Sequence, residues 1–320
     1  MQQTPNSQGV WGDCKFFTEQ DVKECDFWVV IEGLFETQTC YCPPENTLLI
    51  TMEPYRGLYY PQKFLRQFGN VLTFHPDIRH PKIIYDKSAS LPVCWPWMIN
   101  KNYDELKDLQ SFTKQRVLSA ICSNKVVYPG HVKRIEFMAK LVKRLDIDFY
   151  GRGIREFKDK WDVIAPYKYH VAIENSNFPN FFTEKLTDSF LCWTYPFYYG
   201  CPNLGKYFPE GSFTMIDVDD VEGSVKKIED AITDNVYEKA IDKIQLAREL
   251  ILDRYDLAPV IFNIIHSLKL NVVKKNLTLI PARDFLGLNL RVLNRVSTEF
   301  LVLRTRKKVR DCIQQLSRKE

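Results

Sequence analysis

Short apolar runs separated by turn residues dominate the first third of the chain. Runs of this length that are rich in β-branched and aromatic side chains are typical of buried strands. The sequence therefore predicts strands at 27–31, 47–52 and 70–74. A further strand is predicted at 117–122, after a connecting segment that begins near residue 106.

Beyond residue 130 the pattern alternates between strand-like runs and amphipathic stretches. Over 131–146 the apolar side chains recur at helical spacing and the basic ones lie on the other face, which predicts a helix. Helices are also expected at 183–192, 221–233 and 237–253, with strands at 147–150, 169–173, 195–199 and 212–216. Strands and helices that alternate in this way predict a parallel sheet covered by helices.

Length and composition fit a globular protein of two domains. The chain has 320 residues, and about 150 residues per domain is usual. The net charge of +4 arises from 44 basic and 40 acidic residues. This balance lacks the basic excess of a nucleic-acid-binding protein, so we expect no nucleic-acid partner.

The sequence shows no targeting or membrane signal. No apolar stretch is long enough for a transmembrane helix, and the first residues lack the pattern of a signal peptide. The nine cysteines are scattered, and the pair at 40 and 42 has no second pair at zinc-site spacing. We therefore expect reduced thiols, no structural metal and a cytoplasmic location.

The densest group of functional candidates lies between a predicted strand and a predicted helix. Glu174, Asn175 and Ser176 follow the strand, and Glu184 and Lys185 open the helix. Ligands of α/β sheets bind beyond the carboxyl ends of strands, and a helix N-terminus attracts phosphate. Lys185 would add a charge there, and Glu184 could accept hydrogen bonds from a ribose. The same residues could instead simply cap and charge the start of the helix.

The residues around this group resemble a known family. The sequence YKYHVAIENS at 167–176 and FFTEKL at 181–186 are similar to the signature of the α-1,3/4-fucosyltransferases, glycosyltransferase family 10. Further stretches with this resemblance lie at 52–54, 73–77, 123–124, 134, 148–153, 195–200 and 208–213.

The resemblance implies an α/β fold of the GT-B type, with two Rossmann-like domains that face each other across a cleft. We expect an N-terminal acceptor-side domain at 1–115 and a domain that binds the GDP-sugar donor at 116–265. A C-terminal helical tail is expected at 266–320.

The resemblance also implies that fucose moves from GDP-fucose to a saccharide hydroxyl, with inversion and without a metal or other cofactor. Such chemistry needs a carboxylate to take the proton of the hydroxyl, and cations to stabilise the departing diphosphate. Glu53 matches the base, while Arg134 and Lys185 match the cations. The other expected donor-binding residues are Glu174, Asn175, Ser176, Phe181 and Glu184. The family usually has a tyrosine where this chain has Phe181, so one hydroxyl contact to the donor is missing.

Alternatives to this interpretation remain open at the level of sequence. The same fold could use another nucleotide sugar, or the chain could bind saccharides without turnover. Asp217 and Asp219 have the D-x-D spacing that binds metal in other sugar transferases, although the family has only a polar loop there. The basic residues at 304–310, together with apolar ones nearby, suit peripheral membrane contact; a helix packed on the protein is the other interpretation.

Overall fold

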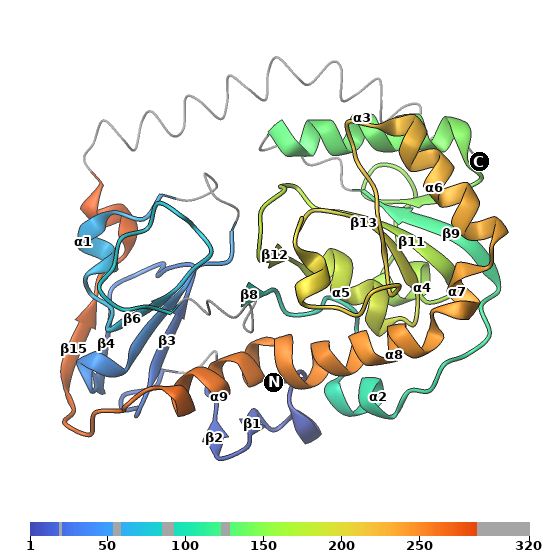
Figure 1. Ribbon diagram of the computed structural model, residues 1–320. Coiled ribbons are helices and arrows are strands. Elements are labelled where there is room, and N and C mark those ends of the chain that lie inside the picture. The colour runs from blue at the N-terminus through green and yellow to red at the C-terminus, as the bar shows by residue number, and fades with distance from the viewer. Residues whose placement is uncertain (19–20, 54–58, 85–92, 123–128, 287–320) are drawn as a thin grey trace.

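A computed structural model describes residues 1–18, 21–53, 59–84, 93–122 and 129–286 (Figure 1). Two parallel sheets, each in its own half of the molecule, form the framework. The α/β class that the sequence predicts is confirmed, and the two parallel sheets agree with the two Rossmann-like domains expected of the GT-B type.

The sheet of the N-terminal half has the order β3-β5-β6-β7, with every pair parallel. Its strands are β3 (Trp28–Ile31), β5 (Thr47–Ile50), β6 (Asn70–Leu72) and β7 (Ile83–Ile84). All four residues of β5 are buried, as expected for a central strand that is covered on both faces. The strands predicted at 27–31, 47–52 and 70–74 are thus confirmed, each within two residues of its bounds.

The sheet of the second half, called the donor half below, has the order β10-β9-β11-β13-β14 and is also parallel throughout. Its strands are β9 (Arg116–Ile121), β10 (Asp148–Tyr150), β11 (Tyr167–Ile173), β13 (Tyr195–Tyr199) and β14 (Thr214–Met215). From β9 the chain first moves outward to β10 and then returns to β11 on the other side of β9. The order of the strands therefore reverses between β9 and β11, which is where ligands bind in open α/β sheets.

Helices alternate with these strands, as the sequence predicts. The helices of the donor half are α3 (Pro129–Arg144), α4 (Lys160–Ile164), α5 (Glu184–Leu191), α6 (Val221–Thr233), α7 (Val236–Lys239) and α8 (Ile241–Leu250). The remaining elements are α1 (Gln62–Leu65), α2 (Tyr103–Asp108), α9 (Leu257–Ser267), β1 (Val10–Trp11), β2 (Cys14–Lys15), β4 (Gln38–Cys42), β8 (Val93–Cys94), β12 (Phe181–Phe182) and β15 (Lys275–Leu279). Short 3-10 turns lie at Pro5–Ser7, Pro44–Asn46, Leu204–Lys206 and Ala282–Phe285, and a π-turn lies at Ile251–Tyr255.

The chain crosses from one half to the other at different residues from those that the sequence predicts. Trp97, Ile99 and Leu106 belong to the core of the donor half, so the chain enters that half before residue 97 rather than at 116. After α8 it returns, because α9 packs Val260 and Ile264 into the core of the N-terminal half. Figure 1 shows α8 and α9 running through the lower part of the molecule from one half to the other. The boundaries expected after residues 115 and 265 thus shift to about 97 and 256.

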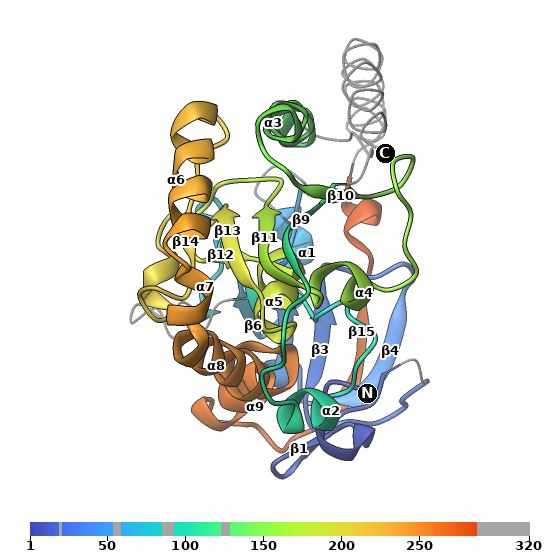
Figure 2. The same ribbon diagram turned by 90° about the vertical axis from the view of Figure 1, so that its right-hand side faces the viewer.

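The segment after α9 differs from the expected helical tail. β15 is a strand that pairs antiparallel with β4, from Lys275 opposite Cys42 to Leu279 opposite Gln38 (Figure 2). Leu279 is fully buried in the core of the N-terminal half. Residues 266–286 therefore extend the N-terminal half, and the basic stretch at 304–310 lies outside the described residues. None of the helices in the described ranges is long and apolar enough to span a membrane.

Candidate active site

The point where the strand order reverses brings the start of α3 against the end of β11. A Cβ atom on Gly130 would lie 1.8 Å from the carbonyl oxygen of Asn175, so only glycine permits this approach. Farther along α3, Nη1 of Arg134 donates a hydrogen bond of 2.5 Å to Oδ1 of Asn175. Arg134 is only 6% exposed, so its charge is held at this place. Two predicted donor residues, Arg134 and Asn175, are thus in direct contact.

Glu174 holds the start of α5 against the end of β11. Its carboxylate accepts hydrogen bonds of 2.8 Å from both the backbone N–H and the hydroxyl of Thr183. Thr183 in turn caps α5, because its hydroxyl accepts a hydrogen bond from the backbone N–H of Lys185. Glu174 itself is 2% exposed. Glu174 therefore stabilises the start of α5 from within the protein. Its direct contact with a donor stays a prediction.

Lys185 is the outward-facing member of the charged group at the start of α5. Its Nζ lies 3.1 Å from a carboxylate oxygen of Glu184 and 3.5 Å from one of Glu174. The side chain of Lys185 is 24% exposed, whereas those of Glu184 and Glu174 are 11% and 1% exposed. An approaching anion would therefore meet the ammonium before either carboxylate.

The charges of Arg134 and Lys185 act on each other. Burial and the nearby Arg134 oppose the charged form of Lys185, but the carboxylates of Glu174 and Glu184 outweigh them and raise the pKa of Lys185. Two partly buried cations that repel each other favour an anion that neutralises both. Arg134 contacts Asn175 and Lys185 lies beside the neighbouring Glu174, so both residues that the resemblance assigns to a diphosphate lie at the carboxyl end of β11.

Lys160 and Asp188 complete this charged group and were not predicted. Nζ of Lys160 lies 2.8 Å from Asp188 and 3.6 Å from Glu184. Burial favours the neutral form of Glu184, but the ammonium groups of Lys185 and Lys160 outweigh it and lower the pKa of Glu184 to about 2. Glu184 is therefore ionised at neutral pH. No local pattern marks Lys160, which is the first residue of α4 and lies 24 positions before Glu184.

Phe181 and Ser176 are not part of the charged group at the start of α5. Phe181 is 1% exposed, and its ring lies 5.0 Å from the ring of Phe74 in the other half. It is the first residue of β12, which pairs in parallel with β8. Phe181 thus joins the two halves, while Ser176 is half-buried in the loop after β11. Donor contacts of both residues stay predictions.

Glu53 lies just beyond the carboxyl end of β5, in the N-terminal half, and is half-buried. Its carboxylate has no hydrogen bond within the described ranges. Its carbonyl oxygen lies 2.8 Å from Nε2 of His75, a residue outside the predicted site. The end of β5 corresponds in its own sheet to the end of β11 in the donor half, so each predicted group lies at the carboxyl edge of a parallel sheet.

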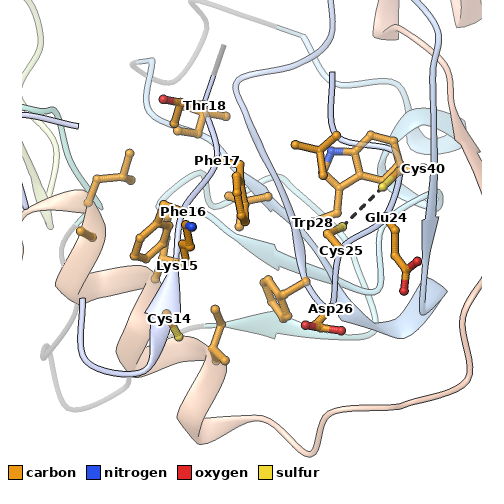
Figure 3. A pocket seen from close by; sticks show the side chains of 18 of the residues that line it. Cys14, Lys15, Phe16, Phe17, Thr18, Glu24, Cys25, Asp26, Trp28 and Cys40 are labelled. Atoms are coloured by element: carbon orange, nitrogen blue, oxygen red, sulfur yellow. Dashed lines mark hydrogen bonds between the residues drawn. The ribbon is translucent and has the colours of Figure 1, made fainter. Parts of the chain in front are cut away.

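A broad pocket of about 1810 Å³ lies elsewhere in the N-terminal half (Figure 3). None of the predicted site residues line it. Sγ of Cys25 lies 3.6 Å from Sγ of Cys40 in its wall, and the cysteines with described side chains are free thiols. Asp13, with Cys14 and His266, also lines this pocket and forms the single metal-compatible group among the described residues.

The alternative metal pair, Asp217 and Asp219, takes part in internal contacts. Lys133 forms an ion pair of 2.9 Å with Asp219, and the backbone N–H of Asp219 donates to the carboxylate of Asp217. Both carboxylates thus form an ion pair or a hydrogen bond with other described residues.

Comparisons with known proteins agree with the family that the sequence resembles. Residues 112–236 match the family described as glycosyltransferase family 10 (fucosyltransferase), C-terminal part. A fucosyltransferase-like protein of Arabidopsis thaliana is 28% identical over 188 residues, which cover 57% of this chain and 35% of that protein. The human 4-galactosyl-N-acetylglucosaminide 3-alpha-L-fucosyltransferase 9 is 28% identical over 110 residues, which cover 33% of this chain and 30% of that protein.

A solved structure of an α1,3-fucosyltransferase with GDP-fucose is 17% identical and has a TM-score of 0.42, covering 68% of this chain and 79% of that one. The chain matches about a third of the length of its curated relatives. The match over residues 112–236 confirms the resemblance to glycosyltransferase family 10 that the sequence shows.

Proposed function

We propose that the protein is an inverting glycosyltransferase that moves fucose from GDP-fucose to a hydroxyl of a saccharide, without a metal ion. The observation that carries this proposal is that Arg134, held by Asn175, and Lys185, held by Glu174, both lie at the carboxyl end of β11, within the stretch that matches family 10. Two cations at the N-terminal turns of α3 and α5 suit a diphosphate, because charge builds on that group as the sugar leaves.

In the proposed mechanism Glu53 takes the proton of the acceptor hydroxyl. The hydroxyl oxygen then bonds to the anomeric carbon of fucose from the face opposite the diphosphate, and the bond from that carbon to GDP breaks. Arg134 and Lys185 stabilise the negative charge that GDP carries away, which is the task a metal performs in other transferases. Asn175 orients Arg134, and the ionised Glu184 accepts hydrogen bonds from hydroxyl groups of the donor.

The test has two stages. Calorimetry with GDP first measures whether the donor half binds the nucleotide, and release of GDP from GDP-fucose is then followed with a panel of acceptor sugars. We expect GDP to bind without added metal, and one class of acceptor to increase GDP release. A protein that does not bind GDP would refute the proposal.

A second candidate is transfer of a sugar other than fucose by the same site. Phe181 favours this alternative, because the family usually has a tyrosine there and a missing hydroxyl alters what a donor pocket recognises. Assays with other GDP-sugars and other nucleotide sugars separate the two. Faster turnover with one of these donors than with GDP-fucose would establish the second candidate.

A further inference from the structure

The peptide groups of Met52 and Glu53 are held by side chains from three other segments. The carboxylate of Glu32 accepts hydrogen bonds from the backbone N–H groups of both residues. The indole N–H of Trp95 donates to the carbonyl oxygen of Met52 at 3.1 Å. Nε2 of His75 donates to the carbonyl oxygen of Glu53, since a carbonyl can only accept. All four backbone polar groups of Met52 and Glu53 therefore have hydrogen-bond partners. These bonds restrict the backbone position from which the Glu53 side chain extends.

Glu32 reaches this place through a turn of uncommon backbone geometry. It follows the last residue of β3 and has a φ of +62°, in the left-handed region that disfavours side chains larger than glycine. Its own N–H donates to the carbonyl oxygen of Ile50 at 2.8 Å, which ties the turn to β5. A conformation of this kind costs of order 1 kcal/mol and is found mostly where function requires it.

The carboxylates of Glu32 and Glu53 are in opposite situations. One oxygen of Glu32 accepts the two backbone N–H groups, and the other accepts the hydroxyl of Tyr60 at 2.5 Å. Burial raises the pKa of Glu32, while these three donors favour its ionised form. Glu32 is thus occupied by donors within the protein, whereas the Glu53 carboxylate has no hydrogen bond in the described part of the chain.

We propose that Glu32 is the positioning residue for Glu53: it holds the backbone of residues 52 and 53 so that the Glu53 carboxylate is directed at the acceptor hydroxyl. This inference rests on the proposed function, because it takes Glu53 as the base. It gives a task to a partly buried carboxylate that lies outside the stretches that resemble the family.

Hydrogen exchange tests the positioning without any assay of activity. Exchange at the amides of Met52 and Glu53 is followed by mass spectrometry in the wild type, Glu32→Ala and Glu32→Gln. We expect faster exchange in Glu32→Ala, and near wild-type exchange in Glu32→Gln because the amide oxygen can still accept both N–H groups. Glu36→Ala, at an exposed glutamate four positions on, is the matched control. Unchanged exchange in Glu32→Ala would overturn the proposal.

Kinetics then test whether Glu32 acts through Glu53. A base displaced by about 1 Å can lose about a hundredfold in rate, so we expect kcat of Glu32→Ala to fall by between tenfold and about a hundredfold. KM for the donor and the affinity for GDP should stay unchanged. In the Glu53→Gln background the same substitution should cost almost nothing, since the base is already lost. Losses that multiply in the double variant would overturn the proposal.

The two proposals fail in distinguishable ways. If the wild type turns over no nucleotide sugar, the proposed function fails, and hydrogen exchange alone decides whether Glu32 holds the segment. If Glu53→Gln keeps its turnover, another group is the base and the positioning role is refuted with it. If Glu32→Ala does not fold, Tyr60→Phe removes one hydrogen bond of Glu32 and Trp95→Phe removes the bond to Met52. A normal kcat in both of these folded variants would then count against the proposal.

Discussion

At the carboxyl end of β11 the charged side chains are paired with one another, whereas at the end of β5 the backbone is held and the Glu53 carboxylate has no hydrogen bond from the described residues. Lys185 and Lys160 lie between Glu174, Glu184 and Asp188, so the donor half fixes its charges by mutual attraction. Around Glu53 the hydrogen bonds go to peptide groups instead.

The difference suits the two tasks that we propose for these strand ends. A site that binds an anion benefits from cations whose positions are fixed beforehand, because little reorganisation is then needed when charge develops. A general base needs a free oxygen, because a carboxylate occupied by strong donors is a poor proton acceptor. Substitutions at the end of β11 should therefore affect nucleotide binding, whereas those at the end of β5 should affect turnover.

The largest effect is expected from Glu53→Gln. The amide keeps the shape of the side chain but cannot take a proton, and a positioned base contributes about 10²–10⁴-fold in rate. We expect kcat to fall by that factor while calorimetry shows unchanged GDP binding. Asp77→Asn is the control, since Asp77 is an exposed carboxylate on the same side. If Glu53→Gln retains more than about a third of the turnover and Asp77→Asn loses it, Asp77 is the base.

Lys185→Ala should act on binding rather than on the proton transfer. The loss of one charged hydrogen bond costs roughly 1.5–3 kcal/mol, so the affinity for GDP should fall by about ten- to a hundredfold. Lys206→Ala removes an exposed lysine of the same half and should leave the affinity unchanged. Equal GDP affinity in Lys185→Ala and the wild type would place the diphosphate elsewhere.

A buried histidine of the donor half should make stability depend on pH. Burial, with a contribution from Lys160, lowers the pKa of His170 from 6.5 to about 3. Between these values the unfolded chain binds a proton that the folded chain does not, so the free energy of unfolding decreases as pH falls below 6.5. The expected slope from this group is about 1.4 kcal/mol per pH unit. Urea unfolding at several pH values measures it, and a slope unchanged in His170→Gln would contradict the assignment.

The smallest effect is expected from removal of metal ions. In the proposed mechanism Arg134 and Lys185 supply the positive charge at the diphosphate, so EDTA should leave kcat unchanged within error. Loss of turnover with EDTA and its recovery with Mn²⁺ would instead assign the reaction to a metal. In that event Asp219→Asn, which also breaks the ion pair with Lys133, should lose the Mn²⁺ response.

Much of the donor half could be predicted from the sequence because its signals are local. The amphipathic pattern predicts a helix at 131–146, and α3 spans Pro129–Arg144. The turn chemistry around Thr183 predicts the start of α5 to within one residue. Arg134 and Asn175, which are 41 positions apart, could be combined through the resemblance to the family, and the structure brings them into contact.

The remaining features depend on contacts that no local pattern encodes. Glu32 meets Glu53 because two parallel strands end side by side, and Lys160 meets Asp188 across two helices. The return of α9 to the N-terminal half depends on an apolar face that either half could have covered. Such pairings follow from the arrangement of the strands and helices in space, which spacing along the chain does not give.

The passage of α9 and β15 back to the N-terminal half has a consequence for the order of folding during synthesis. Val260, Ile261 and Ile264 cover Leu48 and Ile50, and β15 completes the edge beside β4. The half that leaves the ribosome first is therefore the last to be completed, whereas the segment between about residues 97 and 256 contains its whole core when it emerges. Domains usually fold in the order of their synthesis. In this protein the donor half is expected to fold first and to hold the unfinished N-terminal strands close to the segments that complete them.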